Sequence, residues 1–85
     1  MYSLIIFPKA QKQLLRLPPN DRLRVIAVLR QIREDPYEGK PMQGKHKGFF
    51  TARVWPYRIV YCIDHKIVTV NVIAIGHRKD IYKKL

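Results

Sequence analysis

The stretch FFTARVWPYRIVYCIDHKIVTVNVIAI, residues 49–75, decides the fold of this 85-residue chain. It is rich in β-branched and aromatic residues, which favour strands, and two short segments interrupt it. Trp55-Pro56 forms the first reversal and Asp64-His65-Lys66 the second. The pattern therefore predicts three consecutive antiparallel strands joined by tight turns. They cover about residues 49–54, 57–63 and 67–75.

The middle strand, YRIVYCI at residues 57–63, alternates between two kinds of side chain, so its two faces differ. One face takes Tyr57, Ile59, Tyr61 and Ile63. The other face takes Arg58, Val60 and Cys62. The last of the three strands is apolar nearly throughout, so we expect it in the middle of the sheet, covered on much of both faces.

Upstream of these strands the sequence predicts one further strand and a first helix. Residues 2–7, YSLIIF, have the composition of a strand, and Pro8 suits the first turn of a helix that runs to about Leu17. Pro18-Pro19 ends this helix because the residue before a proline is disfavoured in helical geometry.

A second helix follows and runs to about Glu34, with Asn20 or Asp21 as its expected cap. Residues 36–48 contain three of the four glycines and are expected to be loop. The element order is then β-α-α-β-β-β in a single domain over residues 1–85. This is an α+β fold in which a helix hairpin packs on an antiparallel-rich four-stranded sheet.

The charge of the chain is strongly positive, with 17 Lys and Arg against six Asp and Glu, a net charge of +11. Such a domain attracts nucleic acid or an acidic protein and opposes self-association, so we expect a monomer when it is free. No acid occurs between Glu38 and Asp64, and a solvated basic face is the simplest explanation. The cations in that interval are Lys40, Lys45, Lys47, Arg53 and Arg58.

Several classes of protein are disfavoured by the sequence. No segment approaches the ~20 apolar residues of a membrane span, and MYSLIIF lacks the basic start of a signal peptide. A single cysteine, Cys62, indicates a packed thiol in a reducing cytoplasm. No His/Cys cluster has zinc spacing and no Gly-rich phosphate loop is present, so no metal or other cofactor is expected.

Arg58 is the first candidate site residue, because a guanidinium within an apolar strand is costly to bury without a partner. It can extend to water or pair with a carboxylate, or it can line a concave surface and bind phosphate. The tight hairpin places Arg78, just after the last strand, beside Arg58. Tyr82 can fold back over the same end, whereas His77 points the opposite way if strand geometry persists.

These four side chains would bring two guanidiniums, an imidazole and a phenol to one edge of the sheet. Such a set of groups suits RNA cleavage without a metal. The reaction needs a base for the 2′-hydroxyl proton, cations for the pentacovalent phosphorane and an acid for the departing 5′-oxygen. Arginine holds phosphate oxygens in pairs, and tyrosine can stack on a base.

The whole chain resembles the RelE/ParE superfamily of bacterial and archaeal toxins, which occur with antitoxins in two-gene modules. The resemblance rests on the element order and on FPKAQKQLLRLP, MQGKHKGFFTARVWPYRIVY and IGHRKDIY. Its specific part is the spacing from Arg53 to Tyr57-Arg58 and Tyr61, and then from Gly76-His77-Arg78 to Tyr82.

The RelE-like branch implies a ribosome-dependent mRNA endoribonuclease that acts by attack of the 2′-hydroxyl. By position, Arg58 would stabilise the transition state, Arg78 would help the leaving group, and Tyr82 would orient the nucleotide or assist as base. The best-known members carry two lysines where this sequence has Phe49 and Thr51. Lys45 or Lys47 from the preceding loop, or His77, whose imidazole titrates near neutral pH, can substitute as the base. Residues expected to contact RNA are Lys45, Lys47, Arg53, Trp55, Lys79, Lys83 and Lys84.

Two other functions stay open. One is a ParE-like inhibitor that binds DNA gyrase and cleaves nothing, although such chains generally lack the Arg/Tyr set. The other is an inactive member that binds only antitoxin or RNA. On the toxin hypotheses a small antitoxin is expected to wrap the domain with an amphipathic segment rich in acidic residues, giving a hetero-oligomer.

Overall fold

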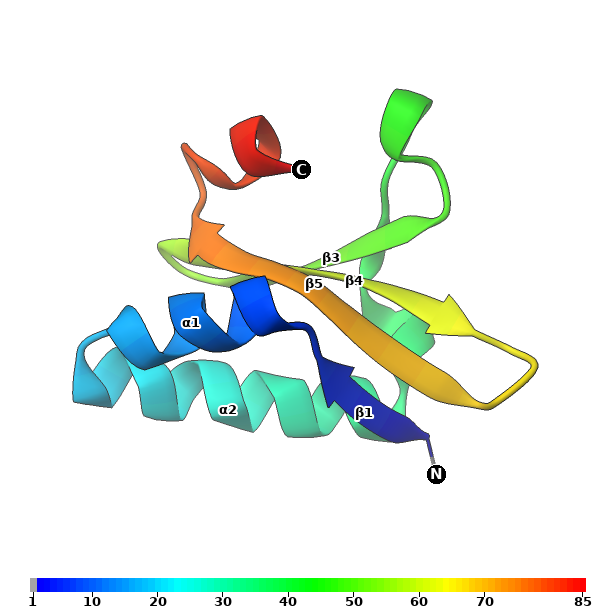
Figure 1. Ribbon diagram of the computed structural model, residues 1–85, viewed down its shortest axis with the longest axis horizontal. Coiled ribbons are helices and arrows are strands. Elements are labelled where there is room, and N and C mark those ends of the chain that lie inside the picture. Colours follow the sequence, from blue (N-terminus) through cyan, green and yellow to red (C-terminus); the bar gives the residue numbers. More distant parts are fainter. Residues whose placement is uncertain (1) are drawn as a thin grey trace.

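The computed structural model describes residues 2–85, apart from the side chain of Lys84. Two α-helices cover one face of a single sheet, and two short 3₁₀ turns, η2 and η3, lie over the other face (Figure 1). In chain order the elements are β1 (Ser3–Ile6), α1 (Pro8–Arg16), α2 (Pro19–Glu34), η1 (Pro36–Glu38), β2 (Lys40–Pro41), η2 (Gly44–His46), β3 (Phe49–Val54), β4 (Tyr57–Asp64), β5 (Thr69–His77) and η3 (Ile81–Lys84).

The sheet has the strand order β1-β5-β4-β3-β2. Strand β1 pairs with β5 in parallel and all other pairs are antiparallel, which confirms the α+β fold with an antiparallel-rich sheet. The prediction of four strands was wrong by one. Lys40 and Pro41 pair with Thr51 and Phe50, so a stretch expected to be loop adds a two-residue edge strand, where proline is tolerated.

The helices occupy the predicted ranges, but the expected cap of the second helix was wrong. Helix α2 begins at Pro19 and has no side-chain cap; the proline itself lacks one of the N–H groups that stay unpaired in a first turn. The carboxylate of Asp21 instead accepts a hydrogen bond of 2.7 Å from the Tyr57 hydroxyl and pairs with Arg24 at 3.4 Å. The contact with Tyr57 joins α2 to the β3–β4 hairpin.

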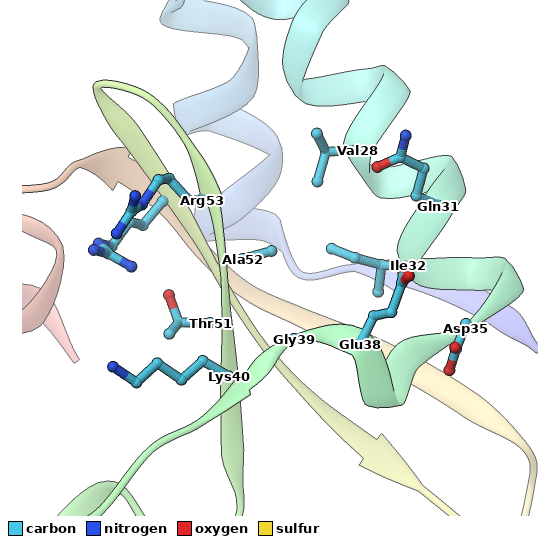
Figure 2. Close-up of a pocket in the computed structure, with 11 residues that line it drawn as sticks. Val28, Gln31, Ile32, Asp35, Glu38, Gly39, Lys40, Thr51, Ala52 and Arg53 are labelled. Carbon is cyan, nitrogen blue, oxygen red and sulfur yellow. The ribbon is translucent and has the colours of Figure 1, made fainter.

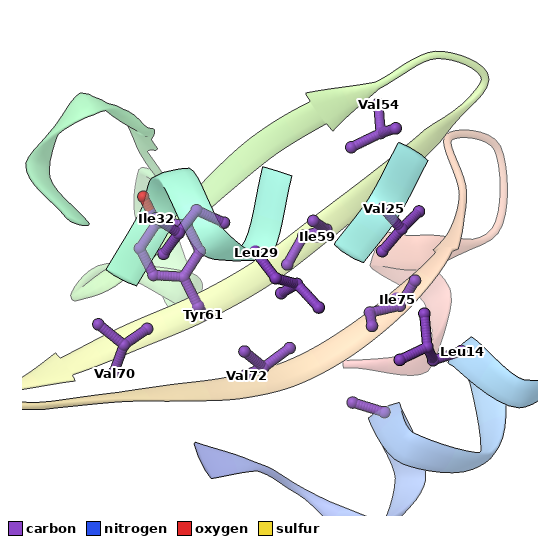
Figure 3. Close-up of a cluster of buried hydrophobic side chains, with 11 residues drawn as sticks. Leu14, Val25, Leu29, Ile32, Val54, Ile59, Tyr61, Val70, Val72 and Ile75 are labelled. Atoms are coloured by element: carbon purple, nitrogen blue, oxygen red, sulfur yellow. The ribbon is translucent and has the colours of Figure 1, made fainter. Parts of the chain in front are cut away.

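The main core lies between the helices and the sheet (Figure 3). Ile59 and Tyr61 of β4 are fully buried there, as the alternation of that strand predicts. Strand β5 lies between β1 and β4, which confirms its interior position. The buried residues of this core are Ala10, Leu14, Val25, Leu29, Ile32, Val54, Ile59, Tyr61, Val70, Val72 and Ile75.

A second, smaller core lies on the opposite face of the sheet. Val60 of β4 and Ala74 of β5 pack against Ile81 of η3, and all three side chains are fully buried. Burial of an isoleucine side chain contributes about 1.5–3 kcal/mol, so Ile81 holds the end of the chain against the sheet. The segment after β5 is therefore docked rather than a free charged tail.

Tyr61 ties the connection between α2 and β2 to the sheet. Its buried hydroxyl donates a hydrogen bond of 2.7 Å to the Pro36 carbonyl, and burial raises the pKa of Tyr61 to about 12. A Cβ atom at Gly39 would overlap this hydroxyl and would lie 3.2 Å from the Thr51 carbonyl oxygen. Only glycine fits at position 39, directly before Lys40 enters β2.

Replacing Gly39 with alanine is expected to lower the free energy of unfolding by about 1–3 kcal/mol, because overpacking forces the Tyr61 ring or the backbone to move. Tyr61→Phe alone is expected to cost about 1–2 kcal/mol, since it leaves the Pro36 carbonyl without its donor. The double variant should cost less than the sum by at least about 0.5 kcal/mol, because the overlapping oxygen is gone. Urea unfolding followed by circular dichroism measures all three, and strict additivity would contradict the close approach.

Tyr61 also predicts how stability falls at alkaline pH. Its folded pKa of about 12 lies above the value near 10 of an exposed tyrosine, so the folded state favours the neutral phenol. This stabilisation is complete below about pH 10 and is lost as the pH rises through about 12, by about 2 kcal/mol in total. Between these limits the unfolding free energy of Tyr61→Phe should fall less steeply than that of the parent chain, whereas parallel curves would contradict the burial of the phenol.

Candidate functional site

Two arginines stand side by side on the sheet face that the helices leave uncovered. Arg53 of β3 and Arg58 of β4 are direct register partners, and Gly76 of β5 lies on the other side of Arg58. Directly opposite residues of antiparallel strands extend to the same face, so the two guanidiniums share one surface. Gly76 adds no side chain, and the Ile81 side chain packs over it, since a Cβ atom there would lie 3.4 Å from Ile81 Cδ1.

The adjacent row of the same face contains Lys40, Thr51, Val60 and Ala74, each paired across its strands. Figure 2 shows that Lys40, Thr51 and Arg53 extend to one side of β3, whereas Ala52 points toward Val28 and Ile32 on the other side. Thr51 is only 6% exposed, and its hydroxyl has no hydrogen-bond partner within residues 2–85 as described.

Two open cavities meet at this face and share Lys40, Thr51 and Arg58. One, of about 270 Å³, lies between the β2 segment and η3 and is lined by Lys40, Pro41, Met42, Gln43, Thr51, Arg58 and Tyr82. The other, of about 380 Å³, adds Arg53 and reaches α2, Asp35 and Glu38. The first cavity brings together Arg58 and Tyr82, as the sequence predicts.

The cations of this face have no acidic partners in the described part of the chain. Lys40, Arg53 and Arg58 make no ion pair there, and the ion pair that is found joins Arg24 to Asp21 on α2. Uncompensated positive charge at the mouth of an open cavity attracts anions, and guanidinium groups suit phosphate oxygens in particular.

Arg78 lies at the same end of the sheet but its side chain rests on Trp55. Its backbone N–H donates to the Pro56 carbonyl at 2.8 Å, and its guanidinium carbon is 4.4 Å from the centre of the Trp55 ring, a cation–π contact. Arg24 in turn donates to the Trp55 carbonyl at 2.6 Å, so α2 helps to hold the hairpin. Trp55 remains 55% exposed and thus could still stack on a base.

His77 is on the other side of the sheet from Arg58, as strand alternation predicts. It is the register partner of Tyr57 and lines a separate cavity of about 160 Å³ that includes Gln13 and Arg16 of α1. Its Nδ1 accepts a hydrogen bond of 3.2 Å from the Lys79 N–H. The role of His77 as base stays a prediction, and its position lends that role no support.

The remaining predicted contacts lie around the site rather than in it. Lys45 is in η2 and Lys47 follows it, and both are exposed and line neither cavity that contains Arg58. Lys79 and Lys83 are exposed near η3, and the side chain of Lys84 lies outside the described residues.

Two residues of the site were not predicted as site residues, although Thr51 was noted as a position at which the best-known members of the RelE-like branch carry a lysine. Thr51 shares a face with Arg53 by simple strand alternation, so the pattern of β3 contained the signal for it. Lys40 counted only as one of several loop cations, because a two-residue strand has no detectable periodicity.

Comparison with known proteins agrees with the fold and shows the family. Residues 4–82 match the family model described as the ParE toxin of the type II toxin-antitoxin system parDE. The toxin RelG of Mycobacterium tuberculosis is 33% identical over 89 residues, covering 98% of each chain. The toxin RelE of the same organism is 31% identical over 84 residues, covering 96% of this chain and 87% of that protein.

Solved structures show the same fold. The toxin–antitoxin complex RelBE2 of M. tuberculosis matches with a TM-score of 0.84 and 30% identity, over 91% of this chain and 98% of that one. The intact RelBE complex of E. coli matches with a TM-score of 0.79 and 25% identity, over 91% and 96%.

The fold and these matches define a toxin of the type II toxin–antitoxin class. The chain belongs to the RelE/ParE family of such toxins, which confirms the resemblance seen in the sequence. None of the described helices is both long enough and apolar enough to cross a membrane.

Because Arg53 and Arg58 are neighbouring like charges, we expect them to lower the free energy of unfolding. Like charges directly opposite in a sheet are destabilising, so Arg58→Met is expected to raise the free energy of unfolding by up to about 1 kcal/mol at low salt. The gain should shrink at about 1 M salt, where the Debye length is about 3 Å. Lys12→Met, which removes an exposed charge from α1, is the control in the same urea titrations. A loss of stability in Arg58→Met would mean that this guanidinium has a stabilising partner.

Proposed function

We propose that this toxin cleaves messenger RNA on the ribosome, by attack of a ribose 2′-hydroxyl on the adjacent phosphate without a cofactor. The observation that carries the proposal is the open cavity that brings Arg58 and Tyr82 together with Lys40, beside Arg53, where these cations have no ion pair among the described residues. Its charge suits the phosphate backbone, and its exposure allows a single strand to enter.

The roles follow from where charge develops in the reaction. Arg58 donates hydrogen bonds to the phosphoryl oxygens, whose negative charge grows in the pentacovalent transition state. Arg78 lies two residues beyond the partner of Arg58, and its guanidinium rests on Trp55 and lines neither cavity that contains Arg58. Its proposed role is to stabilise the departing 5′-oxygen at the edge of the site. Tyr82, 42% exposed at the cavity, orients the nucleotide or assists as base.

The candidates for the general base that the sequence suggests lie away from Arg58. His77 faces α1, and Lys47 lines neither cavity that contains Arg58. The proposal therefore places proton removal on a group within the Arg58 cavity or on one that the ribosome supplies. Lys45, Lys47, Lys79 and Lys83 then serve to contact RNA.

We further propose that a cognate antitoxin binds this chain. The matched RelBE2 and RelBE structures are toxin–antitoxin complexes. An acidic, amphipathic segment would complement the +11 charge, which itself favours a monomer in the absence of the partner.

A second candidate function is inhibition of DNA gyrase without cleavage, which the description of the matched family as ParE toxins favours. Such an inhibitor does not require Arg58 and Tyr82 to share a cavity. Supercoiling assays with purified gyrase therefore separate the two proposals.

Arg58→Ala is expected to slow mRNA cleavage on programmed ribosomes by about 10²–10³-fold, the usual cost of removing one preorganised donor to a developing oxyanion. Lys12→Ala removes the same charge from α1 and should cleave like the parent chain. Primer extension locates the cuts, and growth of cells that express each variant gives an independent measurement. The nuclease proposal fails if the parent chain makes no position-specific cuts and Arg58→Ala arrests growth equally well.

A further inference from the structure

Trp55 is the only tryptophan of the chain, and it belongs to neither of the two apolar cores of the described residues. It lies at the turn between β3 and β4 and is 55% exposed. A tryptophan that stays so exposed gains little from burial, and a small polar residue would suit the turn equally well. The large ring therefore has no role in packing that the fold itself explains.

The backbone that carries this ring is anchored on two sides. Arg24 of α2 donates a hydrogen bond of 2.6 Å to the Trp55 carbonyl, and the Arg78 N–H donates one of 2.8 Å to the Pro56 carbonyl. Both carbonyls of the turn are thus bound, one to a helix and one to the segment that follows β5. The indole ring projects from a turn whose position is fixed.

Arg78 also restrains the ring itself. Its guanidinium carbon is 4.4 Å from the ring centre, which places the guanidinium over one face of the indole. Because Trp55 is still 55% exposed, much of the ring surface away from Arg78 is open to solvent. A ring that is already held in one orientation loses less conformational entropy when a ligand stacks on it.

The ring lies close to the arginine pair of the open sheet face. Trp55 follows Arg53 by two residues, and Arg53 is the register partner of Arg58. Two residues of a strand span about 7 Å, so the ring and the two guanidiniums share one end of the sheet. A single-stranded nucleic acid offers both negative phosphates and flat bases, and adjacent cations with an open aromatic ring complement these two features.

We infer that the face of Trp55 opposite Arg78 is a binding site for one unpaired nucleobase. That the base belongs to an RNA substrate rests on the proposed function, whereas base binding itself does not. The site is separate from Tyr82, since Trp55 lines neither cavity that contains Arg58. Every base has a flat π face, so stacking on Trp55 adds affinity for a single strand without selecting its sequence.

The first test uses the parent chain and a short single strand of 2′-O-methyl RNA, in which attack by the 2′-hydroxyl is blocked. Because Trp55 is the only tryptophan, its fluorescence reports events at this ring alone. We expect the strand to quench the fluorescence and a copy that lacks the base at one position to lose most of the quenching. Binding of the intact strand without a change in Trp55 fluorescence would overturn the base site.

The second test compares affinities for an end-labelled strand by fluorescence anisotropy. Trp55→Leu keeps an apolar side chain but removes the ring, and it should bind about tenfold more weakly, whereas Trp55→Phe should retain most of the affinity. The matched control is Tyr37→Leu, which removes a ring that is 50% exposed and stacks on His65 in the β4–β5 turn, at the other end of β4. An equal loss in Tyr37→Leu would show that any exposed ring contributes and would overturn the base site.

The two tests combine in a double-mutant cycle. Loss of the base that contacts Trp55 should weaken binding to the parent chain about tenfold and binding to Trp55→Leu hardly at all, because the contact is already gone. If base removal weakens binding to both chains by the same factor at every position, no base contacts the ring and the site fails.

Cleavage assays on programmed ribosomes separate this inference from the proposed function. If one base couples to Trp55 but the parent chain cuts no mRNA, the base site stands and the nuclease proposal fails. If the parent chain cuts mRNA, Trp55→Leu cuts it with unchanged kcat/KM and no base couples to Trp55, the nuclease proposal stands and the base site fails. When both hold, Trp55→Leu should lower kcat/KM about tenfold.

Discussion

The register of β4 against its two neighbours is the constraint on which both the core and the site depend. It pairs Arg58 with Arg53 on one side and with Gly76 on the other. Because the side-chain period of a strand is two, a slip of one residue would turn Arg58 into the helix-covered core and expose Ile59. Burial of Ile59 and Tyr61 against the helices therefore fixes the register of β4 and keeps Arg58 on the open face.

Two further anchors bring chain segments from outside the central hairpins to that face. Ile81 packs on Val60 and Ala74 and thereby places Tyr82 at the cavity. The Tyr61 hydroxyl and the close approach of Gly39 hold the segment that leads into β2, which places Lys40 beside Thr51. Packing on both faces of the sheet, together with the Tyr61 hydrogen bond, thus positions the polar and charged groups of the site.

The open face shows what that positioning costs. It contains adjacent arginines without acids and a buried hydroxyl without a partner, both of which oppose folding. Other buried polar groups have partners, as in the contacts of Asp21 with Tyr57 and of Tyr61 with Pro36, although the Nε atoms of Arg22 and Arg33 on α2 also lack one among the described residues. Local departures of this kind concentrate where a protein binds or acts on a ligand.

The sequence by itself determined the order of the two helices and the four longer strands, the two faces of β4 and the placement of Arg58 and His77 on opposite sides, because strand alternation and helical spacing are local patterns. Tertiary structure alone decided that Lys40 enters the sheet, that Thr51 is orphaned beside it and that Arg78 rests on Trp55. A two-residue strand carries no periodic signal, and an unpaired hydroxyl or a cation–π contact exists only between segments distant in the chain. The cap of α2 was mispredicted for a related reason, since Asp21 does not cap the helix and instead accepts a hydrogen bond from Tyr57 of β4.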